Sequence, residues 1–207
     1  MEIKNVVFDF GGVLLDWSPF YVYDDYFGSH QQAADFIENV CTPQWNSTMD
    51  AGTTFEEAVT KLSKIFPEWQ KEIRMYKDRW PDMLKGQIDD GVRLLEDVRQ
   101  SGRYRLFGLT NWSHETFHYA QDNYPFLSYF EDIVVSGRVR MIKPDPGIFR
   151  YLLEHCKINP HETLFIDDSG KNILAAKDLG FVTVHFNEPA RGAARVREVL
   201  GLGPARA

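Results

Sequence analysis

The sequence has no cluster of lysine and arginine, and no long block of charge of one sign. Its 23 basic and 30 acidic residues give a net charge of −7. Proteins that bind nucleic acid need grouped basic side chains, because these neutralise the phosphates along the strand. The charge pattern therefore argues against nucleic acid as a partner.

Cysteine is also scarce, since Cys41 and Cys156 are the only two in 207 residues and lack the spacing of a metal site. Two cysteines allow one disulfide, but so few in a chain of this length is typical of a reducing compartment. The N-terminal segment has neither the apolar run nor the small-residue cleavage site of a secretory signal. No segment reaches the roughly 20 apolar residues of a membrane helix. We therefore expect a cytoplasmic protein without a membrane partner.

The sequence does contain short apolar runs that are rich in β-branched and aromatic residues, as is typical of strands buried on both faces. Four or five segments have this composition: Ile3–Phe8, Tyr104–Leu109, Ile133–Val135, Thr163–Ile166 and Phe181–Phe186. Helical patterns lie between them, at Gly91–Ser101, Pro146–Cys156 and Asn172–Leu179. This alternation predicts an α/β fold with a doubly wound, Rossmann-like parallel sheet.

The alternation breaks once, between about Trp17 and about Lys85, where no run has the character of a buried strand. Three amphipathic stretches in this region predict helices, at Ala33–Val40, Phe55–Ile65 and Pro67–Trp80. The region is too long for a simple crossover between strands. We therefore predict a small helical cap at residues 17–85, inserted into a core formed by residues 1–16 and 86–207.

The C-terminal region predicts a last helix followed by a frayed tail, GLGPARA. We interpret Arg191, Arg195 and Arg197 as the solvated face of that helix and not as a partner site.

Polar residues follow the predicted strands, and in a parallel sheet ligands bind at the carboxyl ends of the strands. The first strand runs into Asp9, and Gly11 and Gly12 follow. A carboxylate at this position can attack phosphorus and form an aspartyl phosphate, and paired glycines let a ligand or an ion approach the backbone closely. The alternative is an aspartate that caps a turn.

The next two clusters carry groups that suit a phosphate. Thr110 and Asn111 can hold phosphate oxygens, unless they cap a helix that begins near Ser113. Lys143, which is followed by a proline at the start of a helix, can neutralise an attacking carboxylate and a phosphate as a point charge. The alternative is a solvated surface lysine.

The last cluster holds two adjacent carboxylates, Asp167 and Asp168. At the end of a buried strand they repel each other unless a cation or strong donors compensate. Mg²⁺ prefers oxygen ligands completed by water and substrate phosphate, so the pair predicts a magnesium site. The alternative is a turn in which the aspartates and Ser169 cap the next helix. The four clusters together make a complete phosphoryl-transfer site, and such a combination arises by coincidence far less often than any one of them.

The segments FDFGGVLLD, LTN, KPD and IDDSGKN resemble, in this order, the four motifs of the haloacid dehalogenase superfamily of hydrolases. The resemblance covers nearly the whole chain, and the predicted insertion is similar to that family's type 1 cap. It implies that Asp9 is the nucleophile and a magnesium ligand. The further metal ligands that it implies are the carbonyl of Gly11, the carboxylate of Asp168 and, close by, that of Asp167.

The resemblance also implies that Thr110 and Asn111 bind phosphate, that Lys143 stabilises charge and that Asn172 orients the acidic loop. We therefore expect a magnesium-dependent phosphatase of small phosphorylated metabolites that forms an aspartyl phosphate. Two alternatives stay open: a metal-independent 2-haloacid dehalogenase, and a catalytically impaired binding module. The oligomeric state is left open.

One position departs from the family pattern. Phosphatases of this family usually carry a second aspartate two residues after the nucleophile, as general acid and base, and here that position is Gly11. Such catalysis is typically worth ~10²–10⁴-fold in rate. Either the substrate has a weakly basic leaving group, such as an anomeric sugar phosphate, or another group takes over. The candidates for that group are Asp16, Asp50 and His114.

Within the superfamily, the sequence is most similar to phosphatases of the α-D-glucose-1-phosphate type, which share this glycine and the IDD segment. The stretch MDAGTTFEEAV resembles part of their cap, which places Trp45, Asp50 and Gly52 near the substrate mouth. The alternative is an ordinary turn between helices, in which Gly52 ends one helix and Thr54 and Glu57 form a capping box at the next.

Overall fold

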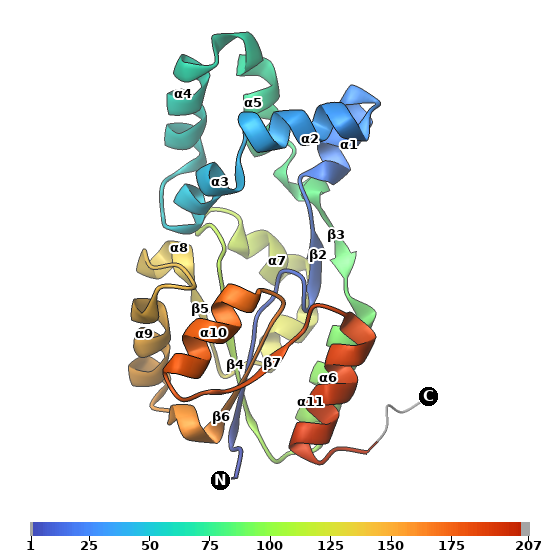
Figure 1. Cartoon of the computed structure of the whole chain (residues 1–207), viewed down its shortest axis with the longest axis vertical. Helices are drawn as coiled ribbons and strands as arrows, with labels where there is room; N and C mark the ends of the chain where they lie inside the picture. Colours follow the sequence, from blue (N-terminus) through green and yellow to red (C-terminus); the bar gives the residue numbers. More distant parts are fainter. Residues whose placement is uncertain (1, 204–207) are drawn as a thin grey trace.

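A five-stranded parallel sheet forms the centre of the computed structural model, which describes residues 2–203 (Figure 1). In spatial order the strands are β5 (Asp132–Val135), β4 (Arg105–Thr110), β1 (Asn5–Phe8), β6 (Thr163–Asp167) and β7 (Val182–His185). The chain runs outward from β1 to β5, then returns to β6 on the other side of β1. The winding thus reverses between β1 and β6, where sheets of this kind bind ligands.

The doubly wound α/β fold is therefore confirmed, and each predicted strand lies within one or two residues of its expected bounds. The strands are buried because alternate side chains enter two different apolar layers. On β1, Val6 and Phe8 join one layer and Val7 joins the other, and all three are fully buried.

Helices cover both layers (Figure 1). The layer around Val7 packs against α9 (Pro146–Cys156) and α10 (Gly170–Asp178). The opposite layer packs against α6 (Asp89–Gln100), α7 (Phe117–Asn123) and α11 (Pro189–Leu200). The shorter elements of the core are η3 (Pro125–Tyr129), α8 (Ser136–Val139) and η4 (Pro160–Glu162).

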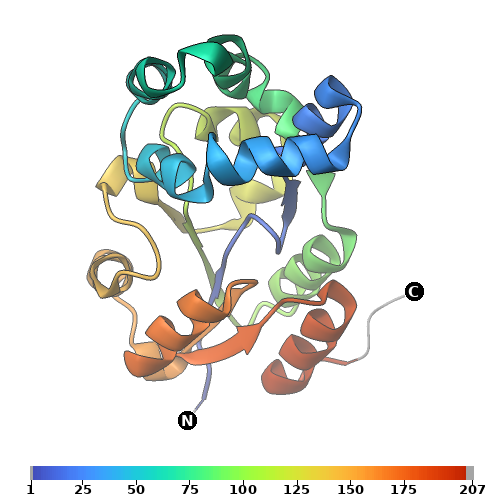
Figure 2. The same ribbon diagram turned by 45° about the horizontal axis from the view of Figure 1, so that its top comes forward.

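Between β1 and β4 the chain forms a separate layer of helices beyond the carboxyl edge of the sheet (Figures 1 and 2). These helices are α1 (Phe20–Phe27), α2 (His30–Asn39), α3 (Pro43–Asp50), α4 (Phe55–Ile65) and α5 (Gln70–Asp78). The helices predicted at Ala33–Val40 and Phe55–Ile65 correspond to α2 and α4. The helix predicted at Pro67–Trp80 is instead divided into η1 (Pro67–Trp69), α5 and η2 (Trp80–Met83). Prolines occupy the first turns of both 3₁₀ segments, because proline is excluded from a helix interior.

A two-stranded sheet that the sequence did not predict joins this helical layer to the core. β2 (Leu15–Trp17) pairs antiparallel with β3 (Leu84–Gln87), where the chain enters and leaves the insertion. Both strands are too short to show an alternating pattern, and Gly86 lowers the strand propensity of β3. The pairing holds the two connections of the insertion side by side.

The C-terminal helix corrects one prediction. Arg191 and Arg195 are exposed, but Arg197 is only 8% exposed and pairs with Asp97 of α6. Because α11 packs against α6, this arginine faces the helix interface and not solvent. Most of the predicted tail GLGPARA, residues 204–207, lies outside the described residues.

Cys41 and Cys156 are buried free thiols, so they form no disulfide with each other. Within residues 2–203, no helix combines the length and the apolar character that a membrane crossing requires.

Candidate active site

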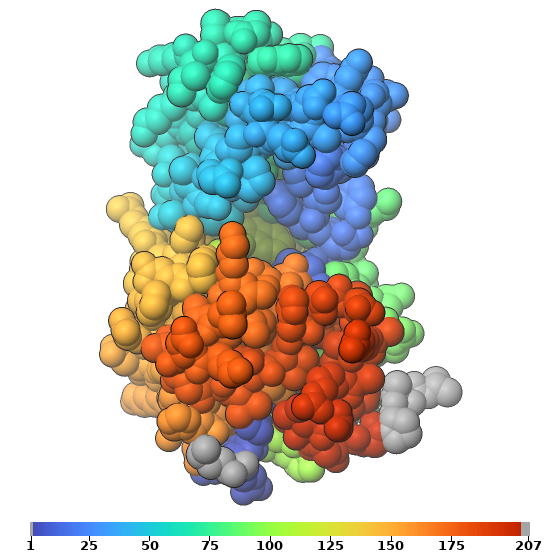
Figure 3. Space-filling view, viewed as in Figure 1, coloured from blue at the N-terminus to red at the C-terminus, as the bar shows by residue number. Residues whose placement is uncertain are grey.

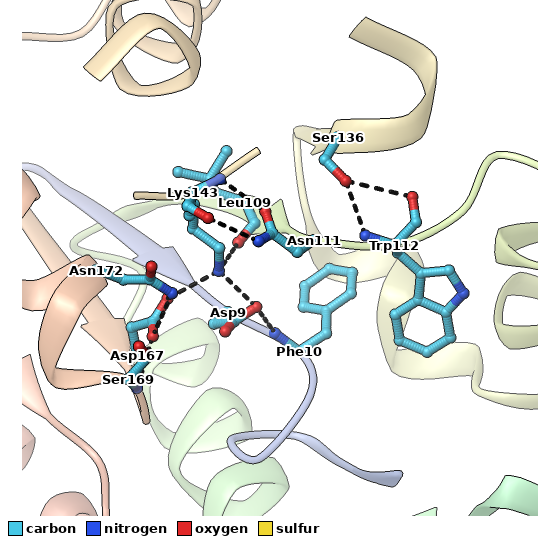
Figure 4. Close-up of polar contacts among 10 residues, drawn as sticks. All are labelled: Asp9, Phe10, Leu109, Asn111, Trp112, Ser136, Lys143, Asp167, Ser169 and Asn172. Atoms are coloured by element: carbon cyan, nitrogen blue, oxygen red, sulfur yellow. Dashed lines mark hydrogen bonds and ion pairs between the residues drawn. The ribbon is translucent and has the colours of Figure 1, made fainter. Parts of the chain in front are cut away.

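Asp9 directly follows β1, where the winding of the sheet reverses. Its backbone N–H donates to the carbonyl of Ile166 on β6 at 2.9 Å, which holds this turn against the neighbouring strand. The side chain is buried, and its Oδ1 accepts from the backbone N–H of Phe10 at 2.7 Å and lies 2.8 Å from Nζ of Lys143 (Figure 4). Within residues 2–203, Oδ2 has no hydrogen-bond partner, so this oxygen is available to a ligand or as a nucleophile.

Lys143 is buried and not a surface lysine, with an exposed fraction of 3%. Its ammonium contacts three oxygens: the carbonyl of Leu109 at 2.9 Å, Asp167 Oδ2 at 2.7 Å and Asp9 Oδ1 at 2.8 Å (Figure 4). Burial lowers its pKa, but the charges of Asp167 and Asp9 outweigh burial, and the net pKa is raised. Lys143 is therefore a permanent positive charge between two carboxylates.

The two adjacent aspartates after β6 differ in environment. Asp167 is fully buried and accepts from Lys143, from the backbone N–H of Ser169 at 2.8 Å and from Nδ2 of Asn172 at 3.0 and 3.1 Å. Asp168 is exposed, and it packs on Gly12, whose φ of +72° and proximity to the carboxylate leave no room for a Cβ atom. The first and last motif loops thus approach as closely as they do because residue 12 is glycine.

The carboxylates of Asp9, Asp167 and Asp168 have oxygens that all lie within 4.8 Å of one another. Burial, opposed by Lys143, raises the pKa of Asp9 well above its ordinary value, and the charges of Asp167 and Asp168 raise it further. Partial burial, followed by the charge of Asp167, also raises the pKa of Asp168. One lysine therefore leaves this cluster with an excess of negative charge, and an all-oxygen cluster of this charge suits a hard divalent cation.

Thr110 ends β4 beside this cluster, and Asn111 directly follows the strand. Thr110 is 1% exposed. The Asn111 amide makes two bonds to the backbone of Lys143, accepting from its N–H at 2.8 Å and donating to its carbonyl at 2.9 Å. The alternative prediction of a helix cap is wrong, because α7 begins later, at Phe117, and its N-cap is Thr116. Sequence reasoning missed that Asn111 positions the lysine, since the two loops are far apart in the chain.

A pocket lies between the cluster and the helical insertion, and the space-filling view shows the surface hollowed between these two layers (Figure 3). Its lining residues share an aromatic or small polar character, apart from one carboxyl group: Gly11, Trp17, Asn46, Asp50, Phe55, Trp80, Asn111, Trp112, Ser113 and Thr116. Residues from both layers line it, so a ligand there contacts the strand ends and the insertion together.

Of the three residues considered as a replacement acid, only Asp50 lines the pocket. Asp16, on β2, accepts from the hydroxyl of Tyr21 at 2.8 and 2.7 Å. His114 is half-buried and its Nδ1 has no partner within the described residues, but it is not part of the pocket lining.

Asp50 is the last residue of α3. Its Oδ2 accepts from Nδ2 of Asn46 at 3.0 Å, and Asn46 Oδ1 in turn accepts from the hydroxyl of Tyr76 at 2.9 Å. Burial raises the pKa of Asp50 to about 7, although the nearby charge of Lys143 lowers it. At neutral pH this carboxyl group is therefore present in both its acid and its base form.

The turn after Asp50 rests on the core. The hydroxyl of Ser136 donates to the carbonyl of Asp50 at 2.6 Å. The same hydroxyl accepts from the N–H of Trp112 at 2.9 Å (Figure 4). Gly52 has φ +100°, and a Cβ atom on it would come within 3.1 Å of the Gly137 carbonyl. These contacts hold the end of α3 against the core at the edge of the pocket.

The capping box that was predicted as the alternative for this turn is present, since Thr54 and Glu57 form it at the start of α4. Asp50 nevertheless reaches the pocket, as also expected. Trp45 does not, because its ring packs on Tyr76 and its Nε1 donates to the carbonyl of Ala58 at 3.3 Å.

The sequence of this chain is similar to known proteins of one family. The model of the haloacid dehalogenase-like hydrolases matches residues 6–186. The chain is 37% identical to bifunctional epoxide hydrolase 2 of Mus musculus over 73 residues, which are 35% of this chain and only 13% of that protein. It is 27% identical to the D-ribitol-5-phosphate phosphatase of Bacteroides thetaiotaomicron over 200 residues, 92% of this chain and 94% of that protein.

A solved structure is also similar. It is an enzyme of the same family from Bacteroides thetaiotaomicron in complex with magnesium and inorganic phosphate, with a TM-score of 0.70 and 26% identity. The likeness covers 88% of this chain and 93% of that one. The family match extends from β1 to the end of the sheet, and the four strand-end clusters surround one site, so the chain belongs to the haloacid dehalogenase-like hydrolase family.

Proposed function

We propose that this protein is a magnesium-dependent phosphatase of small phosphorylated metabolites, and that it works through an aspartyl phosphate on Asp9. One observation carries the proposal: a buried carboxylate, of which one oxygen has no partner among residues 2–203, lies beside a buried lysine and two further carboxylates. The similarity to a ribitol phosphate phosphatase and to a magnesium–phosphate complex supports it.

Each residue has a role in this proposal. Asp9 Oδ2 attacks phosphorus, because its other oxygen is held by Phe10 and Lys143. Lys143 stabilises the charge that develops on the phosphoryl oxygens.

The metal would be held by the carboxylates of Asp9, Asp168 and Asp167 and by the carbonyl of Gly11. When bound, Mg²⁺ neutralises the excess negative charge of the cluster and of the phosphate. Asp168 is suited to direct ligation because it is exposed, whereas Asp167 already accepts from Lys143, Ser169 and Asn172.

Phosphate oxygens would bind Thr110 and the remaining N–H of Asn111. We further propose that residues 17–85 act as a cap over the core, formed by residues 1–16 and 86–207, and that the aromatic wall of the pocket packs against the non-reacting part of the substrate. Sugar phosphates fit this description because they have both apolar faces and hydroxyl groups. A small soluble substrate agrees with a cytoplasmic location.

A substrate panel tests the proposal. Phosphate release is measured for sugar phosphates, nucleotides and p-nitrophenyl phosphate, with Mg²⁺ and with EDTA. We expect turnover with Mg²⁺ only, and no turnover or phosphoenzyme in Asp9→Asn. Chloride release from 2-chloropropionate that survives EDTA would instead show a dehalogenase. Absence of both activities, together with failure to bind beryllium fluoride, would indicate a binding module.

A further inference from the structure

We infer that Asp50 is the general acid and base of this site, supplied from the helical insertion in place of a side chain at Gly11. The inference rests on the proposed phosphatase function. The acid form of Asp50 protonates the leaving oxygen, and its carboxylate then deprotonates the water that releases the phosphate.

The space above Gly11 is open to the pocket. Gly11 lines the pocket, and a Cβ atom built on it meets no atom of the described residues within 4 Å. The three N–H donors of Lys143 are all in use, on Leu109, Asp9 and Asp167. The ammonium of Lys143 is therefore not free to protonate a leaving group in this space.

The composition of the pocket wall also points to Asp50. Within the described part of the chain, Asp50 is its one carboxyl or imidazole group, the others being aromatic, amide, hydroxyl or glycine residues. The neighbouring carboxyl group of Glu115 accepts a hydrogen bond from the backbone N–H of Phe55, so it is engaged with the start of α4. Asp16 is likewise held by Tyr21.

The carboxyl group of Asp50 is held through one of its two oxygens. Two successive hydrogen bonds lead from the Tyr76 hydroxyl through the Asn46 amide to Oδ2 of Asp50. Within residues 2–203, Asn46 is the one side-chain partner of this carboxyl group. Oδ1 is left for the substrate. The contact between Ser136 and the Asp50 carbonyl fixes the backbone against the core, so the carboxyl group belongs to the insertion but is positioned by both layers.

The environment of Asp50 suits both roles. The charged and titratable groups around it are Lys143 from the core and Tyr76 from α5, while Arg140 and Glu115 contact the turn that follows. Burial raises its pKa to about 7, which is where general acids and bases are most effective at neutral pH.

The reaction balances with this assignment. In the first half, Asp9 forms a bond to phosphorus, the ester P–O bond breaks, and the Asp50 proton passes to the leaving oxygen to give a neutral alcohol. In the second half, water attacks phosphorus and loses a proton to Asp50, and the bond between Asp9 and phosphorus breaks. Inorganic phosphate leaves, and both aspartates return to their starting states.

The test compares two leaving groups in the Asp50→Asn variant. For an alkyl phosphate that the wild type cleaves, kcat should fall about 10²-fold or more, because the alkoxide needs a proton. For p-nitrophenyl phosphate, the phenolate leaves without one. The variant should therefore give a burst of product equal to the enzyme concentration, followed by slow turnover, since the base for the second half is missing.

Three further measurements complete the design. Asp35→Asn, an exposed carboxyl on α2, should leave both rates unchanged. The double variant Gly11→Asp/Asp50→Asn should cleave the alkyl phosphate at least about tenfold faster than Asp50→Asn does, because a side chain at residue 11 enters open space. The alkyl phosphate rate of the wild type should fall as the pH rises through about 7, and that fall should be absent in Asp50→Asn.

Unchanged ratios of alkyl to aryl rates in Asp50→Asn would overturn the inference, while the Mg²⁺-dependent activity of the wild type would still support the proposed function. A wild type inactive on all phosphate esters would overturn both. A thermal melt checks that the variant is folded, and Asp50→Ser, which also lacks the carboxyl group, should give the same split between leaving groups.

Discussion

Replacing Asp50 with asparagine should stabilise the protein above neutral pH, even though it removes activity. The reason is the cost of burying a charge. Burial raises the pKa of Asp50 from 3.8 to about 7, so the folded state binds this proton more tightly than the unfolded chain does. The stability that the neutral carboxyl group contributes is complete below the unfolded pKa and is lost as the pH rises to the folded pKa.

The size of the effect follows from the interval between the two pKa values. Each pKa unit corresponds to about 1.4 kcal/mol. Between pH 5 and pH 8.5 the wild type passes through about two of these units, so it loses about 3 kcal/mol that Asp50→Asn retains. For a chain of this length, such a loss corresponds to roughly 6–12 °C in Tm.

Thermal unfolding by circular dichroism at pH 5 and pH 8.5, in EDTA, measures this difference. We expect the Tm of Asp50→Asn to exceed that of the wild type by more at pH 8.5 than at pH 5, with Asp35→Asn showing no such change. An equal difference at both pH values would refute the reasoning, since it would mean that the Asp50 carboxyl group is not desolvated. A pocket acid that destabilises the fold is an expected trade between activity and stability.

Two other predictions concern the carboxylate cluster. Lys143→Met should lower the free energy of unfolding by about 3–5 kcal/mol in EDTA, because it leaves Asp9 and Asp167 buried without their cation. Denaturant unfolding measures this loss, and excess Mg²⁺ should recover part of it. A loss below about 1 kcal/mol would argue against a buried ion pair. Gly12→Ala should weaken Mg²⁺ binding in calorimetry, because the added methyl group displaces Asp168 and strains a backbone at φ +72°, whereas Gly203→Ala should bind as the wild type does.

The sequence predicted the strand-end clusters because their chemistry is local. A buried strand that is followed by Asp9, or one that ends at Asp167 with Asp168 next, can be recognised within ten residues. Parallel strands bring their carboxyl ends to one edge of the sheet. The order of the strands then brings these clusters together, since β6 returns to the side of β1. This is why the fold and the acidic cluster agree with the sequence analysis.

The sequence did not predict contacts between distant loops. The hydrogen bonds between the Asn111 amide and the backbone of Lys143 join two segments that are far apart in the sequence, and the local pattern of one does not predict its contact with the other. Arg197 was predicted to lie on the solvated face of the last helix, yet the packing of α11 on α6 buries it beside Asp97. Such pairings depend on how the helices pack, which hydrophobic periodicity alone does not specify.

The general acid, too, was determined partly by the sequence and partly by the tertiary structure. The sequence by itself determined that the usual residue is absent at Gly11, and it left Asp16, Asp50 and His114 as candidates for its replacement. Only the tertiary structure separated them, because the insertion folds over the sheet and places one carboxyl group in the pocket, where burial changes its pKa. A side chain's proton affinity depends on its surroundings, and those are assembled from both layers of the molecule.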